Sequence, residues 1–174
     1  YEESAAVPMI AAGAGIPAGA VCRQPVSHVD VHPFIMQCVG EAADPALPGV
    51  SLFDLANGAE PGRTVLSEYH GMGSSEGAFM VRDGRFKLNH FVTHPPQLFD
   101  LEADPEELND LAADPAHAAD LERCRARLLA MLDPAEVDAR AKARQADLLA
   151  RAGGREAVIA RGDLGFSPPP GTRA

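Results

Sequence analysis

Four short segments in the middle of the chain carry the apolar patterning that is typical of β-strands. They cover Thr64–Tyr69, Gly77–Val81, Arg85–Phe91 and Gln97–Leu101. Asp83-Gly84 separates the second segment from the third, and Asp-Gly between two such runs predicts a tight hairpin, because both residues tolerate positive φ. We therefore expect a small antiparallel sheet of four strands, whose short last strand lies at an edge.

The third of these segments alternates charged and apolar side chains. Arg85 and Lys87 stand between Phe86 and Leu88. Because successive side chains of a strand point to opposite faces of the sheet, this pattern predicts that Arg85 and Lys87 face the solvent.

Helical patterns flank the predicted sheet, which gives an α+β fold class. Capping residues and apolar stripes predict helices over 27–40, 51–57, 114–132, 135–152 and 155–161. Two further strands are expected, over Val7–Ala12 and Ala20–Ser27. The first is a continuous apolar run, as in a strand buried inside a larger sheet. Turn chemistry and a short helix start are expected over 104–111, and an extended proline-rich tail over Gly165–Gly171.

Charge and length exclude two classes of function. The 174 residues include 25 acids against 15 bases, a net charge of −10, whereas nucleic-acid phosphates demand a basic face. No run approaches the roughly 18 apolar residues of a membrane span. The first residue is Tyr1 and not Met, with nothing like a signal peptide, so we expect the chain to continue a longer polypeptide.

Neither the cysteines nor the histidines are spaced as a metal site. Cys22, Cys38 and Cys124 stand far apart, so we expect buried free thiols in a reducing compartment. That favours the cytoplasm, although the sequence leaves localisation open. His28 and His32 have helical metal spacing but lack further ligands, so no metal is expected on this chain.

Several blocks together resemble the C-terminal portion of type I, formylglycine-dependent sulfatases, which belong to the alkaline phosphatase superfamily. In order, the blocks read YEES, GAGIPAG, VSHVDVHPF, GVSLFDL, SEYHG, VRDGRFKLNHF and QLFDLEADPEELNDLA, and they cover about 1–112. The remainder is similar to the tail of the branch that contains choline-sulfatases and phosphonate monoester hydrolases. The resemblance implies the C-terminal subdomain of an alkaline-phosphatase-like α/β fold.

The same resemblance implies that the catalytic groups lie elsewhere. Family members hydrolyse a sulfate or phosphonate ester with a formylglycine, made from a C/S-x-P/A-x-R motif, and a divalent metal, calcium or manganese. None of the three cysteines stands in that motif. The metal ligands, and the catalytic Lys just upstream of the tyrosine that matches Tyr1, also precede this chain. No catalytic residue is therefore assigned here, no cofactor is expected to bind this chain, and the chain alone is predicted to be inactive.

Three positions depart from the family pattern. Ala6 replaces the usual Arg of Y-E-x-S-x-R-V-P, which removes the contact that Arg makes. Phe34 replaces the Thr of V-D-x-x-P-T, which predicts repacking at the start of that helix. Asp110 replaces an Asn but can accept the same local backbone bonds.

Candidate substrate contacts lie in loops that would rim the family's substrate pocket. The loop Glu68–Glu76, which follows the first strand of the sheet, offers His70 and Tyr69, and the next loop offers His94. For each, a structural role is the alternative: a hydrogen bond to a neighbouring backbone carbonyl for His70, packing for Tyr69, and loop structure for His94. Asp100, Asp104 and Glu107 are interpreted as turn and cap groups, because they lack calcium-loop spacing.

Two functions from different classes follow from these observations. The first is the C-terminal part of a sulfatase-type hydrolase, which completes the fold, rims the pocket for a small sulfate or phosphonate ester and helps to form a homo-oligomer. The second is a non-catalytic binding or interaction module derived from a sulfatase. The predicted division is 1–60 as the end of the sulfatase α/β domain, 61–133 as the sheet subdomain with its helix, and 134–174 as a tail that contacts another subunit.

Overall fold

The computed structural model describes the whole chain apart from residues 14, 17, 72–73 and 163–174. It contains two compact units, Tyr1–Pro134 and Ala135–Ala174, which we describe separately. Of the helices in the described part, none has the length and apolar content to cross a membrane.

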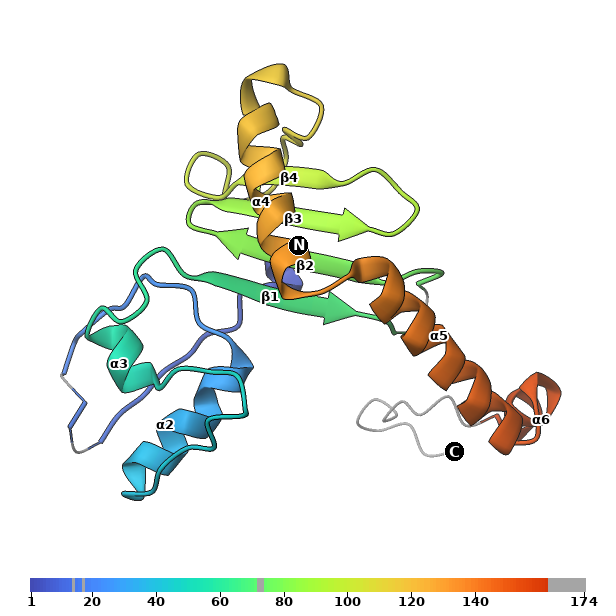
Figure 1. Cartoon of the computed structure of the whole chain (residues 1–174), viewed down its shortest axis with the longest axis horizontal. Coiled ribbons are helices and arrows are strands. Elements are labelled where there is room, and N and C mark those ends of the chain that lie inside the picture. The colour runs from blue at the N-terminus through green and yellow to red at the C-terminus, as the bar shows by residue number, and fades with distance from the viewer. Residues whose placement is uncertain (14, 17, 72–73, 163–174) are drawn as a thin grey trace, which may run out of the picture. The chain divides into compact units, whose positions relative to one another are not determined.

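The centre of the first unit is an antiparallel sheet with the strand order β1-β2-β3-β4 (Figure 1). The strands are β1 (Thr64–Tyr69), β2 (Ala78–Asp83), β3 (Phe86–Phe91) and β4 (Gln97–Asp100). The predicted four-stranded sheet is therefore confirmed, with small shifts of the strand ends. β4 lies at an edge, as expected.

The β2–β3 turn differs from the prediction by one residue. Asp83 pairs with Phe86, so the two central residues of the turn are Gly84 and Arg85. Gly84 has a φ of 60°, and Arg85 is not among the residues with positive φ. A type II′ hairpin requires this pattern, with Gly at its first central position. Asp83 instead accepts a hydrogen bond from the hydroxyl of Thr64 at 2.9 Å, across the β1–β2 pair.

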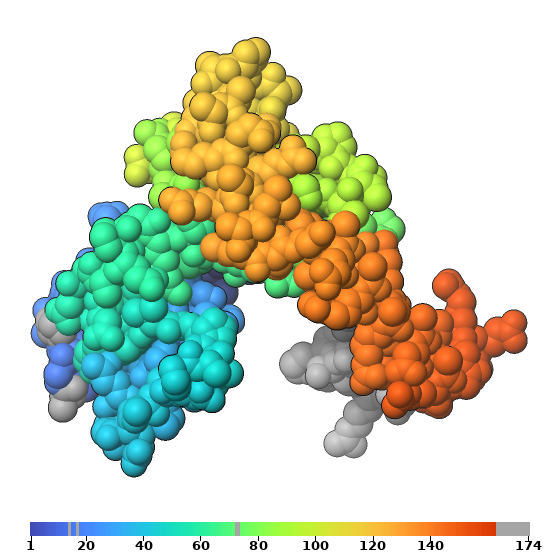
Figure 2. All heavy atoms as spheres, viewed as in Figure 1, coloured from blue at the N-terminus to red at the C-terminus, as the bar shows by residue number. Residues whose placement is uncertain are grey.

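One face of the sheet packs against α4 (Ala118–Met131), which η2 (Pro115–His117) precedes. Phe79, Val81, Leu88 and Leu98 point to this face, and Cys124 and Leu128 of α4 meet them; all six side chains are fully buried. Burial of each Phe, Val or Leu side chain among them stabilises the fold by about 1.5–3 kcal/mol. In Figure 2 the atoms of α4 lie over those of the sheet. The Asp114 carboxylate accepts the Ala116 N–H at 2.9 Å, which confirms the predicted cap.

The region before the sheet consists of short helices joined by longer irregular segments. It contains α1 (Glu2–Ala5), η1 (His28–Asp30), α2 (Val31–Cys38) and α3 (Leu52–Ala56). The predicted helices over 27–40 and 51–57 are thus confirmed. Phe34, the residue in place of the family's Thr, packs its ring on Phe53 with the ring centroids 5.0 Å apart.

Asp30 holds this region to the sheet. Its fully buried carboxylate receives two bonds from the Arg63 guanidinium, at 2.6 and 2.7 Å, and the N–H groups of Ser27 and Val50. Gly49 allows the approach of these loops, because a Cβ there would lie 2.4 Å from the carbonyl oxygen of Val29.

Three predictions of secondary structure are wrong. Neither Val7–Ala12 nor Ala20–Ser27 forms a strand, and Ile10 is 88% exposed. An extended segment becomes a strand only by bonding to a neighbouring strand, and no described segment provides one here. Over 104–111 there is no helix but a series of turns, in which Asp104 accepts the Asn109 N–H at 2.7 Å.

The second unit contains α5 (Pro134–Arg151), whose first residue belongs to the first unit, and α6 (Arg155–Arg161). Both helices are as predicted. Ion pairs one helical turn apart line α5, such as Lys142–Asp138 at 2.8 Å and Arg151–Asp147 at 3.0 Å. The proline-rich tail predicted over Gly165–Gly171 lies outside the described residues.

Candidate functional site

The sheet face opposite α4 carries a hollow of about 880 Å³. Its floor follows from the alternation of the strands, because residues two apart share a face. Its walls come from α1, from the connection between β1 and β2, and from the connection between β3 and β4. The lining residues include Tyr1, Ser4, Ala5, Ser67, Tyr69, Ser74, Ser75, Glu76, Met80, Lys87, Asn89, Phe91, His94 and Gln97.

Two of the three predicted site residues line this hollow. Tyr69, the last residue of β1, is 54% exposed, and the side chain of His94 is 66% exposed. Tyr1 also lines the hollow, where its hydroxyl accepts a hydrogen bond from the Gln97 amide at 3.1 Å. The fold therefore brings Tyr69 and His94 together beside the first residue of the chain.

His70, the third predicted residue, is not among the residues that line the hollow. Its Nε2 atom lies 3.2 Å from a carboxylate oxygen of Glu68. Its ring meets the Phe79 ring edge-on, with the centroids 5.4 Å apart. His70 therefore packs against Phe79, a core side chain on the face of the sheet that α4 covers.

Glu76, which sequence reasoning did not single out, holds the rim of the hollow. Its buried carboxylate accepts the backbone N–H of Thr93 and bonds Nδ1 of His94. Burial opposes the charge on Glu76, but these hydrogen bonds outweigh it and lower the pKa of the carboxyl below its ordinary value. The rim therefore carries an ionised carboxylate behind an exposed imidazole.

Lys87 is not on a solvent face, contrary to the prediction. It is fully buried, and its ammonium group lies 2.9 Å from a carboxylate oxygen of Glu2 and 2.9 Å from one of Glu107. The alternation of charged and apolar residues correctly places Lys87 and Leu88 on opposite faces of the sheet. However, α1 and the 104–107 turn cover the face to which Lys87 points. Glu107 is consequently an ion-pair partner and not only the turn group that was predicted.

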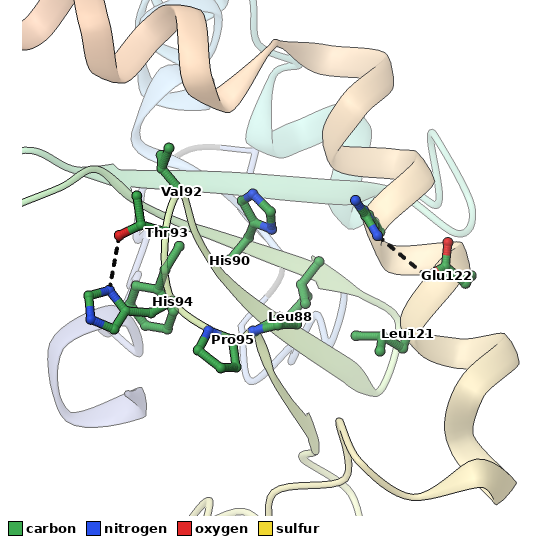
Figure 3. A pocket seen from close by; sticks show the side chains of 11 residues that line it. Leu88, His90, Val92, Thr93, His94, Pro95, Leu121 and Glu122 are labelled. Atoms are coloured by element: carbon green, nitrogen blue, oxygen red, sulfur yellow. Dashed lines mark hydrogen bonds and ion pairs between the residues drawn. The ribbon is translucent and has the colours of Figure 1, made fainter.

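A smaller hollow, of about 360 Å³, lies on the other side of the β3–β4 connection (Figure 3). Leu88, His90, Val92, Pro95 and Leu121 are among the residues that line it. Burial and then the charge of Arg125 lower the pKa of His90, so its imidazole is neutral near pH 7. His94 lines both hollows and sits on the ridge between them.

None of the three cysteines is among the residues that line these two hollows. Cys22 and Cys38 are exposed, which corrects the expectation of burial, and only Cys124 of the three is buried. Within the described ranges, no group of three or more His, Cys, Asp or Glu side chains is placed to hold a metal ion.

Comparison with known proteins adds the following. Residues 1–133 match the family model described as "N-sulphoglucosamine sulphohydrolase, C-terminal". A choline-sulfatase of Rhizobium meliloti (strain 1021) is 40% identical over 108 residues, which are 60% of this chain and 21% of that protein. Arylsulfatase K of Mus musculus is 34% identical over 117 residues, with the same shares. The chain thus spans about a fifth of the length of the curated relatives that it matches.

A solved structure from Bacteroides thetaiotaomicron VPI-5482, described as a sulfatase, superposes with a TM-score of 0.51 at 27% identity, over 68% of this chain and 27% of that one. The resemblance to sulfatases and the α+β class, both predicted from the sequence, are confirmed.

Proposed function

The chain belongs to the N-sulphoglucosamine sulphohydrolase C-terminal family, and from this membership we propose that it acts as the C-terminal subdomain of a sulfatase-type hydrolase. It completes the fold, and the hollow beside Tyr69 and His94 forms part of the rim of the substrate pocket. The ester that is cleaved is a sulfuric or phosphonic ester. The nucleophile, the divalent metal and the general acid come from a catalytic part outside these residues.

One observation carries this proposal: Tyr1, Tyr69 and His94 line the same hollow. Residues that precede Tyr1 in a longer polypeptide would therefore reach the molecule at this hollow. The resemblance to sulfatases assigns the catalytic Lys to a position shortly upstream of Tyr1. The two candidate contacts thus lie where that Lys would approach.

The chemistry of the lining suits a rim and not a catalytic centre. It offers the hydroxyls of Tyr69 and the serines, the amides of Asn89 and Gln97, and the imidazole of His94. Such groups hydrogen-bond the leaving group of an ester and orient it. A developing sulfate charge needs a metal and cations together, and these we assign to the catalytic part.

An exposed apolar segment near the N-terminus supports the proposal that another part of the same polypeptide covers this surface. Val7 is 59% exposed, Met9 41% and Ile10 88%. A contiguous apolar surface of this kind is typical of an interface. The catalytic part would cover it, and its sheet would supply the neighbouring strand that Val7–Ala12 lacks here.

We also propose that the tail after Gly162 contacts a second copy of the protein in a homo-oligomer. Its proline-rich composition favours an extended segment that docks in a groove. Deleting residues 163–174 should then lower the number of subunits in the oligomer, measured as its mass in solution divided by the mass of one subunit. An unchanged number of subunits would show that the tail does not form the interface, and it would leave the proposed hydrolase function unaffected.

The coding sequence upstream of Tyr1 tests the function first. An in-frame C/S-x-P/A-x-R motif with paired acidic metal ligands is the expected result, and an unrelated domain would overturn the proposal. In the full-length enzyme, Tyr69→Phe and His94→Ala should then raise KM for the ester. His70→Ala is the matched comparison, because His70 does not line the hollow. An effect of His70→Ala alone would identify His70 as the contact instead.

A further inference from the structure

Glu76 connects the two loops that rim the larger hollow. β2 pairs Ala78 with Phe91, so the register extended by two residues sets Glu76 opposite Thr93. At this position the side-chain carboxylate of Glu76, and not its backbone, accepts the Thr93 N–H. The Ser74 hydroxyl donates a hydrogen bond to the backbone carbonyl of Glu76. The carboxylate therefore sits at a fixed point between the β1–β2 connection and the β3–β4 connection.

The second oxygen of the same carboxylate bonds His94 through Nδ1. The Thr93 hydroxyl lies 3.3 Å from the same nitrogen, and Figure 3 shows this second contact. Nothing in the described part of the chain bonds the other ring nitrogen, Nε2, of His94. The ring is therefore held from one side only, by a side chain that is itself 7% exposed. The lowered pKa of Glu76 keeps that side chain an acceptor.

We propose that Glu76 is a positioning residue that fixes the proton of His94 on Nδ1 and so presents Nε2 to the ligand of the hollow. A carboxylate accepts hydrogen bonds only, so the ring nitrogen that faces it must carry the proton. A carboxylate that bonds one ring nitrogen sets the tautomer and the orientation of functional histidines in this way. That the ligand is the leaving group of an ester rests on the proposed function, whereas the tautomer does not.

The fixed tautomer defines what His94 offers. In the neutral ring, Nε2 is an acceptor and suits a hydroxyl group of the ligand. In the charged ring, Nε2–H is a donor and suits an oxygen of an ester or of an alcohol. Without Glu76 the neutral ring is free to place its proton on Nε2, and this acceptor is lost. The ligand class is therefore one that carries hydroxyl or ester oxygens.

The tautomer can be read from two-bond ¹H–¹⁵N spectra of the imidazoles in the whole 174-residue chain, recorded at alkaline pH where the rings are neutral. His94→Gln identifies the His94 signals by their loss. In the unmodified chain we expect a protonated Nδ1 and an unprotonated Nε2. A proton on Nε2 overturns the proposal, and this first result needs no variant that must fold.

Glu76→Gln is the direct test, because the amide keeps the size of the side chain but can present its NH₂ group to the ring. We expect the His94 proton to move to Nε2, wholly or in part. Glu68→Gln is the matched control, since Glu68 contacts His70, and it should leave the His94 signals unchanged. Unchanged His94 signals in Glu76→Gln would overturn the proposal. An absent catalytic part upstream would overturn the proposed function but would not alter these spectra.

Discussion

The ammonium group of Lys87 lies 2.9 Å from a carboxylate oxygen of Glu107, and both side chains are almost wholly buried. The other carboxylate oxygen of Glu107 accepts the backbone N–H of Glu2 at 2.5 Å, while the Glu2 side chain also pairs with Lys87. Three segments that are far apart in the sequence thus meet at one cation. This cluster fixes the first residues of the chain on the sheet and so sets where any preceding residues reach the hollow.

Lys87→Met should destabilise the chain by about 3–5 kcal/mol, because it leaves the buried Glu107 carboxylate without its cation. Urea unfolding followed by circular dichroism measures the change. We also expect faster proteolysis within the first residues, since Glu2 loses one of the bonds that hold α1.

The matched variant is the pair Lys87→Met with Glu107→Gln, which removes both charges. It should recover part of the lost stability, because no unpaired charge remains buried. A Lys87→Met chain as stable as the original would contradict the assignment of this cluster.

The sequence alone predicts the sheet and α4 correctly, but it does not predict the burial of Lys87. Strand alternation and the Asp114-Pro115 cap depend on neighbours in sequence, which local patterns describe well. Whether a strand face is covered depends on distant segments. Alternation correctly separates Lys87 from Leu88, yet only the positions of α1 and Glu107 show that Lys87 is buried as well.

The candidate site shows the same division. Tyr69 and His94 were predicted from their loops, and the fold brings them to one hollow. Glu76 was missed, because a single Glu in a Ser-rich loop has no local signature. The β2–β3 register could have indicated it, since that register sets Glu76 opposite Thr93. Val7–Ala12 has a strand pattern without a neighbouring strand among the described residues, so its apolar side chains remain exposed.

Asp30→Asn should cost about 3 kcal/mol near neutral pH, because the nearly buried Arg63 then keeps only the exposed carboxylate of Glu60, at 3.4 Å, as a counter-charge. Urea unfolding of the variant and of the original chain gives the difference. Glu122→Gln is the control, since Glu122 and Arg125 form a loose, exposed pair at 3.7 Å and should contribute little.

The cost of Asp30→Asn should also depend on pH. Burial opposes the charge of Asp30, but the bonds from Arg63, Val50 and Ser27 outweigh it and lower the pKa of the Asp30 carboxyl below its ordinary value. A lowered folded-state pKa gives a contribution that is complete above the unfolded pKa and is lost as pH falls through the folded pKa. The difference between the two chains should therefore shrink below about pH 4; a constant difference would argue against an ionised Asp30.

The three thiols should react in two classes. Cys22 and Cys38 are exposed, whereas Cys124 is buried and burial raises its pKa to about 11. Because the thiolate is the reactive form, a maleimide at neutral pH should add twice to the folded chain and a third time only in denaturant. Mass spectrometry counts the adducts, and Cys124→Ser serves as the control. A rapid third adduct on the folded chain would contradict the burial of Cys124 under the sheet.

The purified chain should not hydrolyse an aryl sulfate, with or without added calcium or manganese. Its hollow holds groups that orient a ligand, but no nucleophile in the motif that becomes formylglycine occurs in the 174 residues. Product release followed by absorbance provides the measurement, and a full-length relative assayed in parallel is the positive control. Turnover that survives further purification and is abolished by His94→Ala would assign catalysis to this chain itself.

Adding the catalytic part as a separate polypeptide should restore turnover only if the exposed segment Val7–Ala12 is intact. Val7→Asp with Ile10→Asp should therefore prevent the restoration without unfolding the sheet, because these two side chains are exposed in the chain alone.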